Sequence, residues 1–119
     1  MKRLLVLGGG TAGTMIVNKL RRALAAAQCE ITIVDQDDAH HYQPGYLFLP
    51  FGTYTPDQVT RSRHAFLPDG VDFVVGEVDV IDAAAGTVSL TNGRSLPYDY
   101  LVIATGVAPR PDQTPVFCF

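Results

Sequence analysis

Six residues near the start of the chain, Gly8-Gly9-Gly10-Thr11-Ala12-Gly13, most strongly limit the folds that this sequence can form. They follow a short apolar run, residues 3–7, which is typical of a fully buried parallel strand. After them, residues 11–27 repeat apolar side chains at a period near 3.6 and predict an amphipathic helix. A second apolar run, residues 30–34, predicts another buried strand. This order indicates a right-handed βαβ unit of about thirty residues.

The glycine spacing, G-x-G-x-x-G, is typical of a turn that binds the pyrophosphate of a dinucleotide. Gly8 allows the tight turn, Gly10 lets the backbone approach the pyrophosphate, and Gly13 lets the helix pack closely on the strand. Thr11 and Ala12 lie at the amino terminus of the helix. The unpaired N–H groups and the positive dipole end at this terminus favour a bound phosphate.

An acidic residue at the end of the second strand supports this interpretation. Asp35 lies about twenty residues beyond the glycines, where its carboxylate can accept hydrogen bonds from an adenosine ribose. Gln36 follows it and is included in the predicted site. The alternative is a glycine-rich turn with an unrelated surface aspartate. The order of strand, turn, helix and acid favours the nucleotide site over this alternative.

The second half of the chain predicts an antiparallel meander instead of a second crossover helix. Residues 77–96 contain short alternating segments, separated by residues 83–86 and by Asn92-Gly93, a strong hairpin signal. Buried parallel strands are expected before the meander, at residues 71–75, and after it, at residues 100–104. The expected fold is α/β: a Rossmann-like parallel sheet with a β-meander crossover, in one domain over residues 1–119.

Composition argues against several other classes of protein. The 119 residues carry a net charge of −3 without a basic cluster, so no nucleic-acid binding is expected. No apolar run reaches the roughly 20 residues that a membrane-spanning helix needs. Cys29 and Cys118 match no metal-ligand spacing, which favours a reducing, cytoplasmic compartment; Cys29 is expected to pack internally and Cys118 to be buried or frayed. No metal site is predicted at His40 and His41, which are expected to form hydrogen bonds or lie at the surface.

Four segments share a longer pattern, VLGGGTAG at 6–13, VD at 34–35, GEVDVID at 76–82 and YDYLVIATG at 98–106. In these segments the sequence resembles the two-dinucleotide-binding-domain flavoproteins, which include pyridine nucleotide-disulfide reductases, type II NADH dehydrogenases and sulfide:quinone oxidoreductases. The resemblance implies FAD as the cofactor, with its pyrophosphate at the glycine turn and its adenosine ribose at Asp35. It also implies that the Val78 backbone contacts adenine and that Ala104, Thr105 and Gly106 pass close to the FAD.

The segment HHYQPGYLFLPFGTYT, residues 40–55, narrows the resemblance. Disulfide reductases carry a C-x-x-x-x-C pair soon after the ribose acid, and this sequence has none there. The segment is similar instead to sulfide:quinone oxidoreductases and type II NADH dehydrogenases, which implies that Pro44 and Tyr42 lie near the flavin ring. The apolar approach to the ring would then include Tyr46, Phe48 and Phe51. The alternative is that these aromatic side chains cover one edge of the core. Residues 34–55 are expected to be irregular, because their period is neither helical nor strand-like.

The resemblance implies an enzyme that moves electrons from sulfide or NAD(P)H through FAD to a quinone. The chain is expected to be its amino-terminal FAD-binding segment, inactive alone, and no catalytic residue is assigned. Sulfide:quinone oxidoreductases use cysteines to accept sulfur, so the resemblance leaves this role as the alternative to a buried or frayed Cys118. Its uncovered surfaces are expected to make it self-associate. A cytoplasmic location is expected, with peripheral association of the full-length protein at the inner face of the membrane. A non-catalytic module that binds ADP or NAD is the alternative, and the meander disfavours a plain NAD dehydrogenase.

Overall fold

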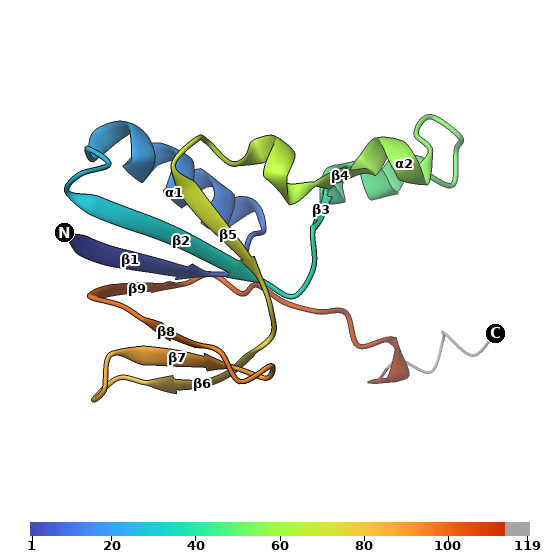
Figure 1. The fold of residues 1–119 in the computed structure, drawn as a ribbon. Coiled ribbons are helices and arrows are strands. Elements are labelled where there is room, and N and C mark those ends of the chain that lie inside the picture. The colour runs from blue at the N-terminus through green and yellow to red at the C-terminus, as the bar shows by residue number, and fades with distance from the viewer. Residues whose placement is uncertain (114–119) are drawn as a thin grey trace.

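The computed structural model describes residues 1–113, and its centre is a four-stranded parallel sheet (Figure 1). The strands are β1 (Lys2–Leu7), β2 (Cys29–Asp35), β5 (Val71–Val75) and β9 (Tyr100–Ile103), in the order β5-β2-β1-β9. β1 and β2 pair in register over six residues, and all strand pairs in the sheet are parallel. The predicted α/β fold with a parallel sheet is confirmed.

Both faces of the sheet are covered, one by a helix and the other by a meander (Figure 1). The helix is α1 (Thr11–Ala23), and the meander consists of β6 (Val78–Asp82), β7 (Thr87–Leu90) and β8 (Ser95–Pro97). Because side chains alternate along a strand, Leu4 and Val6 pack in a cluster with Val17 of α1, while Leu5 packs with Val88 of the meander. Burial on both faces explains why β1 reads as a continuous apolar run.

The meander has the predicted turns. Gly86 and Gly93 follow β6 and β7 with φ angles of +66° and +86°, in the left-handed region that glycine adopts readily. The β6–β7 and β7–β8 pairs are both antiparallel. A short 3₁₀ helix, η3 (Pro111–Gln113), ends the described part of the chain.

Helix α1 is four residues shorter than the periodicity predicts, because the chain must turn to enter β2. Leu24 has extended dihedral angles, φ −113° and ψ 131°, and the Ala25 carbonyl accepts hydrogen bonds from the N–H groups of Gln28 and Cys29. The Arg21 guanidinium donates to the carbonyl oxygens of Leu24, at 2.7 Å, and Cys29, at 2.9 Å. A basic side chain that bonds carbonyls at a helix end stabilises this termination.

A second, smaller structure projects from the sheet (Figure 1), and we call residues 39–62 the aromatic arm. It begins with β3 (Ala39–His41) and ends with β4 (Thr60–Ser62), which pair antiparallel. Between them lie the 3₁₀ helix η1 (Gln43–Phe48) and the short helix α2 (Pro56–Val59). The 3₁₀ helix η2 (Arg63–Phe66) leads back to the sheet. The expectation of an irregular segment at residues 34–55 is therefore wrong in part, since β3 and η1 are regular.

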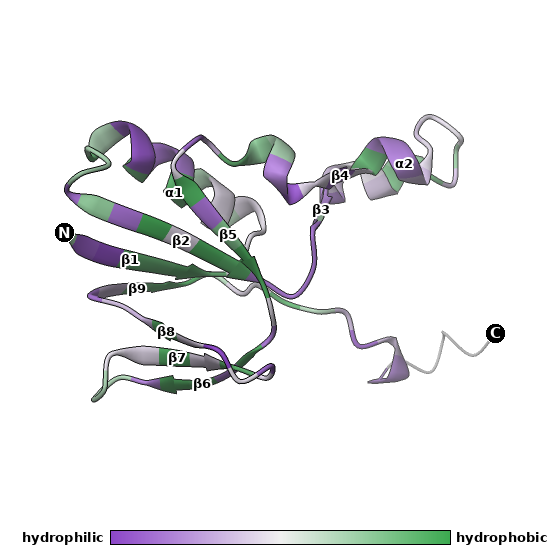
Figure 2. Cartoon of the chain, in the orientation of Figure 1, coloured by the Kyte–Doolittle hydropathy of each residue, from purple (hydrophilic) through white to green (hydrophobic). Residues whose placement is uncertain are grey.

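The arm differs from the sheet in where its apolar residues lie. Figure 2 shows hydrophobic residues both along β2 and β5 and on the helical turns of the arm. The apolar residues of β2 are buried and those of β5 are half-buried apart from the exposed Val75, whereas Leu47 and Phe51 of the arm are 74% and 82% exposed. Within residues 1–113, no helix is long and apolar enough to cross a membrane.

Candidate functional site

The glycine turn lies at the carboxyl end of β1, and each of its three spaced glycines has a different surrounding. Gly8 has a φ of +99°, and a Cβ on it would collide with the Ala104 carbonyl. A Cβ on Gly13 would collide with the Gly8 carbonyl, so α1 and β1 approach as closely as the spacing predicts. A Cβ on Gly10 would meet nothing within 4 Å. Gly8 and Gly13 thus allow close packing of backbone segments within the protein, whereas Gly10 borders open space.

The amino terminus of α1 faces this open space without a cap. Gly10 is the N-cap residue, and no side chain bonds to the first N–H groups of the helix. Thr11 and Ala12 are exposed, and Gly13 is buried. The first N–H groups of a helix have no partners within the helix, and the helix dipole is positive there. The arrangement suits an anion placed against Gly10.

Asp35 lies at the carboxyl end of β2 and is connected to the glycine turn. Its Oδ2 atom accepts a hydrogen bond from the Gly9 N–H at 2.6 Å, and its Oδ1 atom accepts one from the Gln36 N–H at 2.7 Å. Its side chain is 16% exposed. The carboxylate therefore joins the end of β2 to the turn and keeps a small solvent-facing surface.

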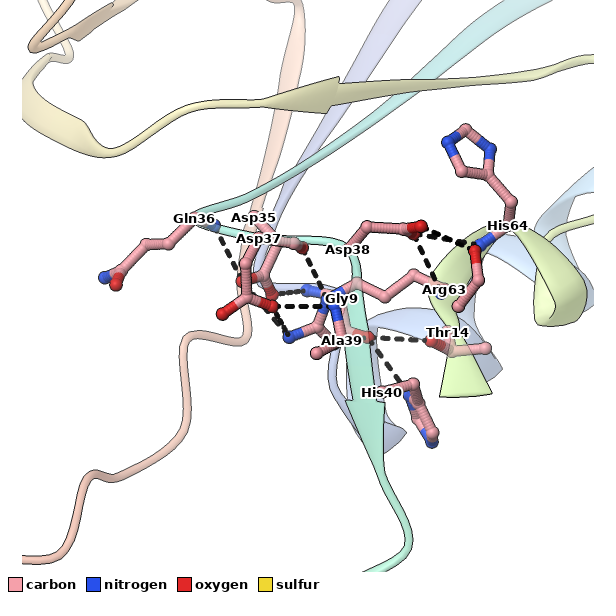
Figure 3. A network of polar contacts seen from close by, with 11 residues as sticks. Gly9, Thr14, Asp35, Gln36, Asp37, Asp38, Ala39, His40, Arg63 and His64 are labelled. Carbon is pink, nitrogen blue, oxygen red and sulfur yellow. Dashed lines mark hydrogen bonds and ion pairs between the residues drawn. The ribbon is translucent and has the colours of Figure 1, made fainter. Parts of the chain in front are cut away.

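Arg63 is a site residue that the sequence-based reasoning did not identify (Figure 3). It is the one charged residue of the described chain that is buried, at 9% exposure. Its guanidinium donates to the Gly9 carbonyl at 2.5 Å and to the Asp37 carbonyl at 2.9 Å, and its Nη2 atom lies 3.3 Å from Asp35 Oδ1. Arg63 follows β4 immediately, so the pairing of β3 with β4 positions it. No local sequence pattern marks it, because its partners are 26 to 54 residues away.

Asp38 holds the base of the same network. Its carboxylate accepts hydrogen bonds from the Ser62 hydroxyl at 2.6 Å and from the Arg63 N–H at 2.9 Å (Figure 3). The Ser62 hydrogen bond is the main cause that lowers the pKa of Asp38, and the backbone N–H groups of His64 and Arg63 and the charge of His64 lower it further. Asp38 thus stays ionised at neutral pH and holds β3 against the start of η2.

Two cavities adjoin each other at Asp35. The smaller, of about 300 Å³, lies between the carboxyl ends of β1 and β2 and the start of the meander. The larger, of about 440 Å³, lies between the glycine turn, the arm and the segment after β9. The smaller cavity is lined by Gly8, Val34, Asp35, Gln36, Gly76, Glu77, Val78 and Thr105. The larger is lined by Gly10, Asp35, Gln36, His40, His41, Gln43, Arg63, Ala104, Thr105, Gly106, Val107 and Ala108.

Most of the predicted site residues therefore lie around one continuous depression. Thr11, Ala12, Gly13 and Pro44 line neither of the two cavities. The first three form the helix terminus beside Gly10, whereas Pro44 lies in η1, one residue beyond Gln43. The structure brings together the glycine turn, Asp35, Val78 and the segment 104–106 and leaves Pro44 at the margin.

The aromatic side chains of the arm do not cover the core. Tyr42, Tyr46, Phe48 and Phe51 are 55%, 42%, 45% and 82% exposed. The alternative that they seal one edge of the domain is therefore wrong for these four.

His40 and Cys29 have ordinary surroundings. The Nδ1 atom of His40 lies 3.4 Å from the Gly9 carbonyl oxygen, and its ring packs on Phe66 with centroids 4.8 Å apart. Among residues 1–113, no group of three His, Cys, Asp or Glu side chains is placed to hold a metal ion. Cys29 is buried in the cluster under α1, which confirms the expectation that it packs internally. Cys118 lies outside the described residues.

The parallel sheet, the glycine turn and the meander define an α/β domain of the FAD/NAD-binding class. In the comparison with known families, residues 2–116 match the family described as pyridine nucleotide-disulphide oxidoreductase, and the chain belongs to that family. The family resemblance expected from the sequence is confirmed. FAD, the predicted cofactor, is the cofactor of this family.

Individual relatives agree with this assignment. A type II NADH:quinone oxidoreductase of Staphylococcus aureus is 36% identical over 107 residues, and a mitochondrial sulfide:quinone oxidoreductase of Dictyostelium discoideum is 27% identical over 105 residues. Both alignments cover 88% of this chain but only 26% and 23% of the relatives. The solved sulfide:quinone oxidoreductase of Aquifex aeolicus matches with a TM-score of 0.74 at 25% identity, over 91% of this chain and 25% of that one. The chain spans about a quarter of the length of these relatives.

The residues present fit a dinucleotide such as FAD. The uncapped terminus of α1 and the open space at Gly10 suit a pyrophosphate. A carboxylate accepts hydrogen bonds at about four lone-pair positions. Asp35 uses two of them for the N–H groups of Gly9 and Gln36, and Arg63 Nη2 forms an ion pair with its Oδ1 at 3.3 Å. Acceptor capacity thus remains for a ribose hydroxyl.

Proposed function

We propose that this chain is the FAD-binding part of a flavin-dependent oxidoreductase that resembles sulfide:quinone oxidoreductase. The observation that carries the proposal is the pair of adjoining cavities, which share Asp35 and meet the glycine turn and the segment 104–106. Two adjoining cavities match the shape of a dinucleotide, whose two halves are joined by a pyrophosphate.

Each predicted site residue has a role in this proposal. The N–H groups at Gly10 and at the start of α1, with Thr11, Ala12 and Gly13, receive the pyrophosphate. Asp35 and Gln36 receive the adenosine ribose, and the smaller cavity, with Gly8 and the Val78 backbone, receives adenine. The larger cavity then receives the flavin half, bordered by Ala104, Thr105 and Gly106, with Pro44 and Tyr42 of the arm farther out.

FAD supplies the redox chemistry of such an enzyme, and the protein binds it, orients it and sets its polar surroundings. For the whole protein we propose sulfide or NAD(P)H as the electron donor and a quinone as the acceptor, in keeping with the activities for which the relatives are named. We infer that the 119 residues bind FAD without turnover by themselves. Because quinones partition into lipid, we also propose a cytoplasmic protein that associates peripherally with the inner face of the membrane.

Titration of the purified chain with FAD, followed by the quenching of flavin fluorescence, tests the proposal. FAD should bind at least about tenfold more tightly than ADP, a difference of about 1.4 kcal/mol, because only FAD fills both cavities. A complex that shows the absorbance band of oxidised flavin supports the assignment. A chain that binds neither FAD nor ADP would be inconsistent with it.

The second candidate is a non-catalytic module that binds ADP or NAD. The separate cavity at Gly8, Asp35 and Val78 favours it, because that cavity alone can receive an adenosine. The same titration separates the two candidates. Equal affinities for ADP and FAD, or a melting temperature that rises with ADP but not with FAD, would favour the second.

A further inference from the structure

We propose that Arg63 is a positioning residue for the nucleotide site. It orients the Asp35 carboxylate, which would accept a hydrogen bond from a ribose hydroxyl, and the Gly10 N–H, which would donate one to a phosphate. The inference rests on the proposed function, because it concerns the same site. Arg63 lies outside every motif of the family resemblance, and it enters the site from the end of the arm. Its burial, at 9% exposure, shows that the fold encloses it instead of leaving it as a solvated surface charge.

Arg63 fixes the orientation of the Asp35 carboxylate. Arg63 Nη2 lies 3.3 Å from Oδ1, the same oxygen that accepts the Gln36 N–H. The other oxygen, Oδ2, accepts only the Gly9 N–H. Gln36 and Arg63 thus both lie on the Oδ1 side, Oδ2 keeps a free acceptor position, and rotation of the carboxylate would lengthen the ion pair with Arg63. Arg63 therefore holds Asp35 in the orientation that offers one oxygen to a ribose hydroxyl.

Arg63 also fixes the peptide between Gly9 and Gly10. Its carbonyl oxygen accepts a hydrogen bond from Arg63 Nη1 at 2.5 Å and a second from the Thr14 hydroxyl at 3.1 Å (Figure 3). In a planar trans peptide, the C=O and the following N–H point in opposite directions. Because the Gly9 carbonyl is drawn toward Arg63, the Gly10 N–H points away from it. The bond thus turns a donor, and not an acceptor, toward a pyrophosphate at the terminus of α1.

The geometry at residue 63 requires an arginine and not only a positive charge. The planar guanidinium directs Nε to the Asp37 carbonyl at 2.9 Å while its two other nitrogens meet Gly9 and Asp35. A lysine ammonium carries the same charge on a flexible stem without this fixed fork. In Arg63→Lys, the ammonium would keep the charge beside Asp35 but could not make the three contacts at once. Arg63→Lys therefore distinguishes the effect of the positive charge from the effect of the guanidinium geometry.

The test compares Arg63→Lys with Arg61→Lys, the same substitution at an exposed residue of β4 two positions away. The ligands are FAD, ADP and 2′,3′-dideoxy-ADP, which lacks the ribose hydroxyls. We expect Arg63→Lys to weaken ADP binding about tenfold or more. The preference for ADP over dideoxy-ADP should also fall severalfold. Arg61→Lys should change neither quantity by more than about twofold.

The ratio of the two affinities distinguishes positioning from a merely structural role. If Arg63 only stabilised the fold, Arg63→Lys would weaken ADP and dideoxy-ADP equally, and an unchanged ratio overturns the proposal. A wild-type chain that binds FAD, combined with an unchanged ratio, overturns this inference alone. A wild-type chain that binds none of the three ligands overturns the proposed function and this inference together.

A measurement on the wild-type chain decides the question if Arg63→Lys fails to fold. The guanidinium N–H resonances of Arg63, assigned by ¹⁵N-arginine labelling, report its hydrogen bonds directly. We expect them to shift on saturation with ADP and to shift less with dideoxy-ADP, because Asp35 connects Arg63 to the ribose. Resonances that respond equally to both ligands overturn the proposal.

Discussion

The parallel sheet and the aromatic arm use similar apolar residues in opposite ways. In the sheet, Val6 and Ile33 are 0% exposed and lie between α1 and the meander. In the arm, Phe51 is 82% exposed, and the two short strands bury no comparable cluster. The sheet is thus held by its own core, whereas the arm is held at its base by polar contacts of Asp38 and Arg63. The stability of this chain thus lies mainly in the sheet, whereas exposed apolar side chains occur both in the arm and on β9 at the edge of the sheet.

Truncation of an apolar side chain should change the free energy of unfolding far more in the sheet than in the arm, and this is the largest effect that we expect. Ile33→Ala deletes a fully buried side chain and should lower the free energy of unfolding by about 2–5 kcal/mol. Phe51→Ala should change it by no more than about 0.5 kcal/mol, because the ring is exposed. Urea denaturation followed by circular dichroism measures both. If Ile33→Ala does not fold, Ile33→Val should cost about 0.5–1.5 kcal/mol. A loss above about 1 kcal/mol for Phe51→Ala, beyond the usual range for surface substitutions, would show that the arm packs in solution.

Two buried glycines allow the comparison at the level of single atoms. A Cβ on Gly13 would collide with the backbone carbonyl of Gly8, which cannot move without opening the turn. A Cβ on Gly45 of the arm would lie 2.6 Å from Val59 Cγ1 and 2.9 Å from Tyr42 Cδ1, a less severe overlap and with side chains instead of a backbone carbonyl. Gly13→Ala should therefore destabilise the protein by about 1–3 kcal/mol, and Gly45→Ala by less. Thermal denaturation measures the difference, and equal losses would contradict the contrast between a rigid sheet and an adaptable arm.

Gly10→Ala is the counterpart of Gly13→Ala that should affect ligand binding more than stability. Its Cβ would point into open space and its φ of −72° suits alanine, but alanine is a poorer N-cap residue than glycine, so stability should fall by no more than about 1 kcal/mol. If the pyrophosphate occupies that space, FAD binding should weaken about tenfold or more. Unchanged binding would place the phosphates elsewhere.

The sequence was sufficient to predict the sheet and the glycine turn, because their signals are local. Strand β5 has the predicted bounds, residues 71–75, and the turns at Gly86 and Gly93 lie where the sequence marks them. Each of these features is specified by residues within a few positions of one another. The fold around them follows from the alternation of buried side chains and from the handedness of the crossover.

The arm and Arg63 could not be predicted in the same way. Strands β3 and β4 have three residues each, too few for a readable alternation, and they pair across a long intervening segment. Arg63 resembles any surface arginine in the sequence, and its burial depends on the closure of that pairing. The early end of α1 could not be predicted for a related reason, because the Arg21 side chain and not a glycine caps this end.

The edge of the sheet and the arm should also differ in how strongly each promotes self-association of the chain. Strand β9 is at the edge of the four-stranded sheet, and its Ile103 and Tyr100 are 62% and 59% exposed. Unpaired edge strands with apolar side chains tend to pair with other chains, and an edge lysine prevents this. We expect the wild-type chain to associate with increasing concentration, Ile103→Lys to shift association to severalfold higher concentration, and Phe51→Lys to have a smaller effect.

Multi-angle light scattering over a concentration series checks this prediction. A wild-type chain that stays monomeric at high concentration would rule out self-association. A larger effect of Phe51→Lys than of Ile103→Lys would identify the arm, and not the sheet edge, as the associating surface.

The smallest expected effect concerns a single surface carboxylate that fastens the sheet. Asp99 Oδ2 accepts a hydrogen bond from the Arg3 backbone N–H at 2.7 Å, and this bond is the main cause that lowers the pKa of Asp99. The hydrogen bond and charge of the Arg3 side chain, at 3.3 Å, and the charge of Lys2 lower it further. Because the pKa is lower in the folded state, the stabilisation is present above the unfolded pKa and is lost as pH falls through the folded pKa.

Asp99→Asn should therefore reduce the acid sensitivity of the sheet. Between about pH 6 and about pH 3, which spans the ordinary titration of aspartate, the wild type should lose more stability than the variant. Urea midpoints at the two pH values measure this difference, with Asp38→Asn as the corresponding change in the arm. The pKa of Asp38 is also lowered, mainly by the hydrogen bond from the Ser62 hydroxyl. Loss of the Asp38 carboxylate should therefore loosen the base of the arm. If stability is concentrated in the sheet, Asp38→Asn should increase the local hydrogen exchange of residues 39–62 more than it lowers the global midpoint. A global loss as large as that of Asp99→Asn would show that the arm and the sheet unfold as one unit.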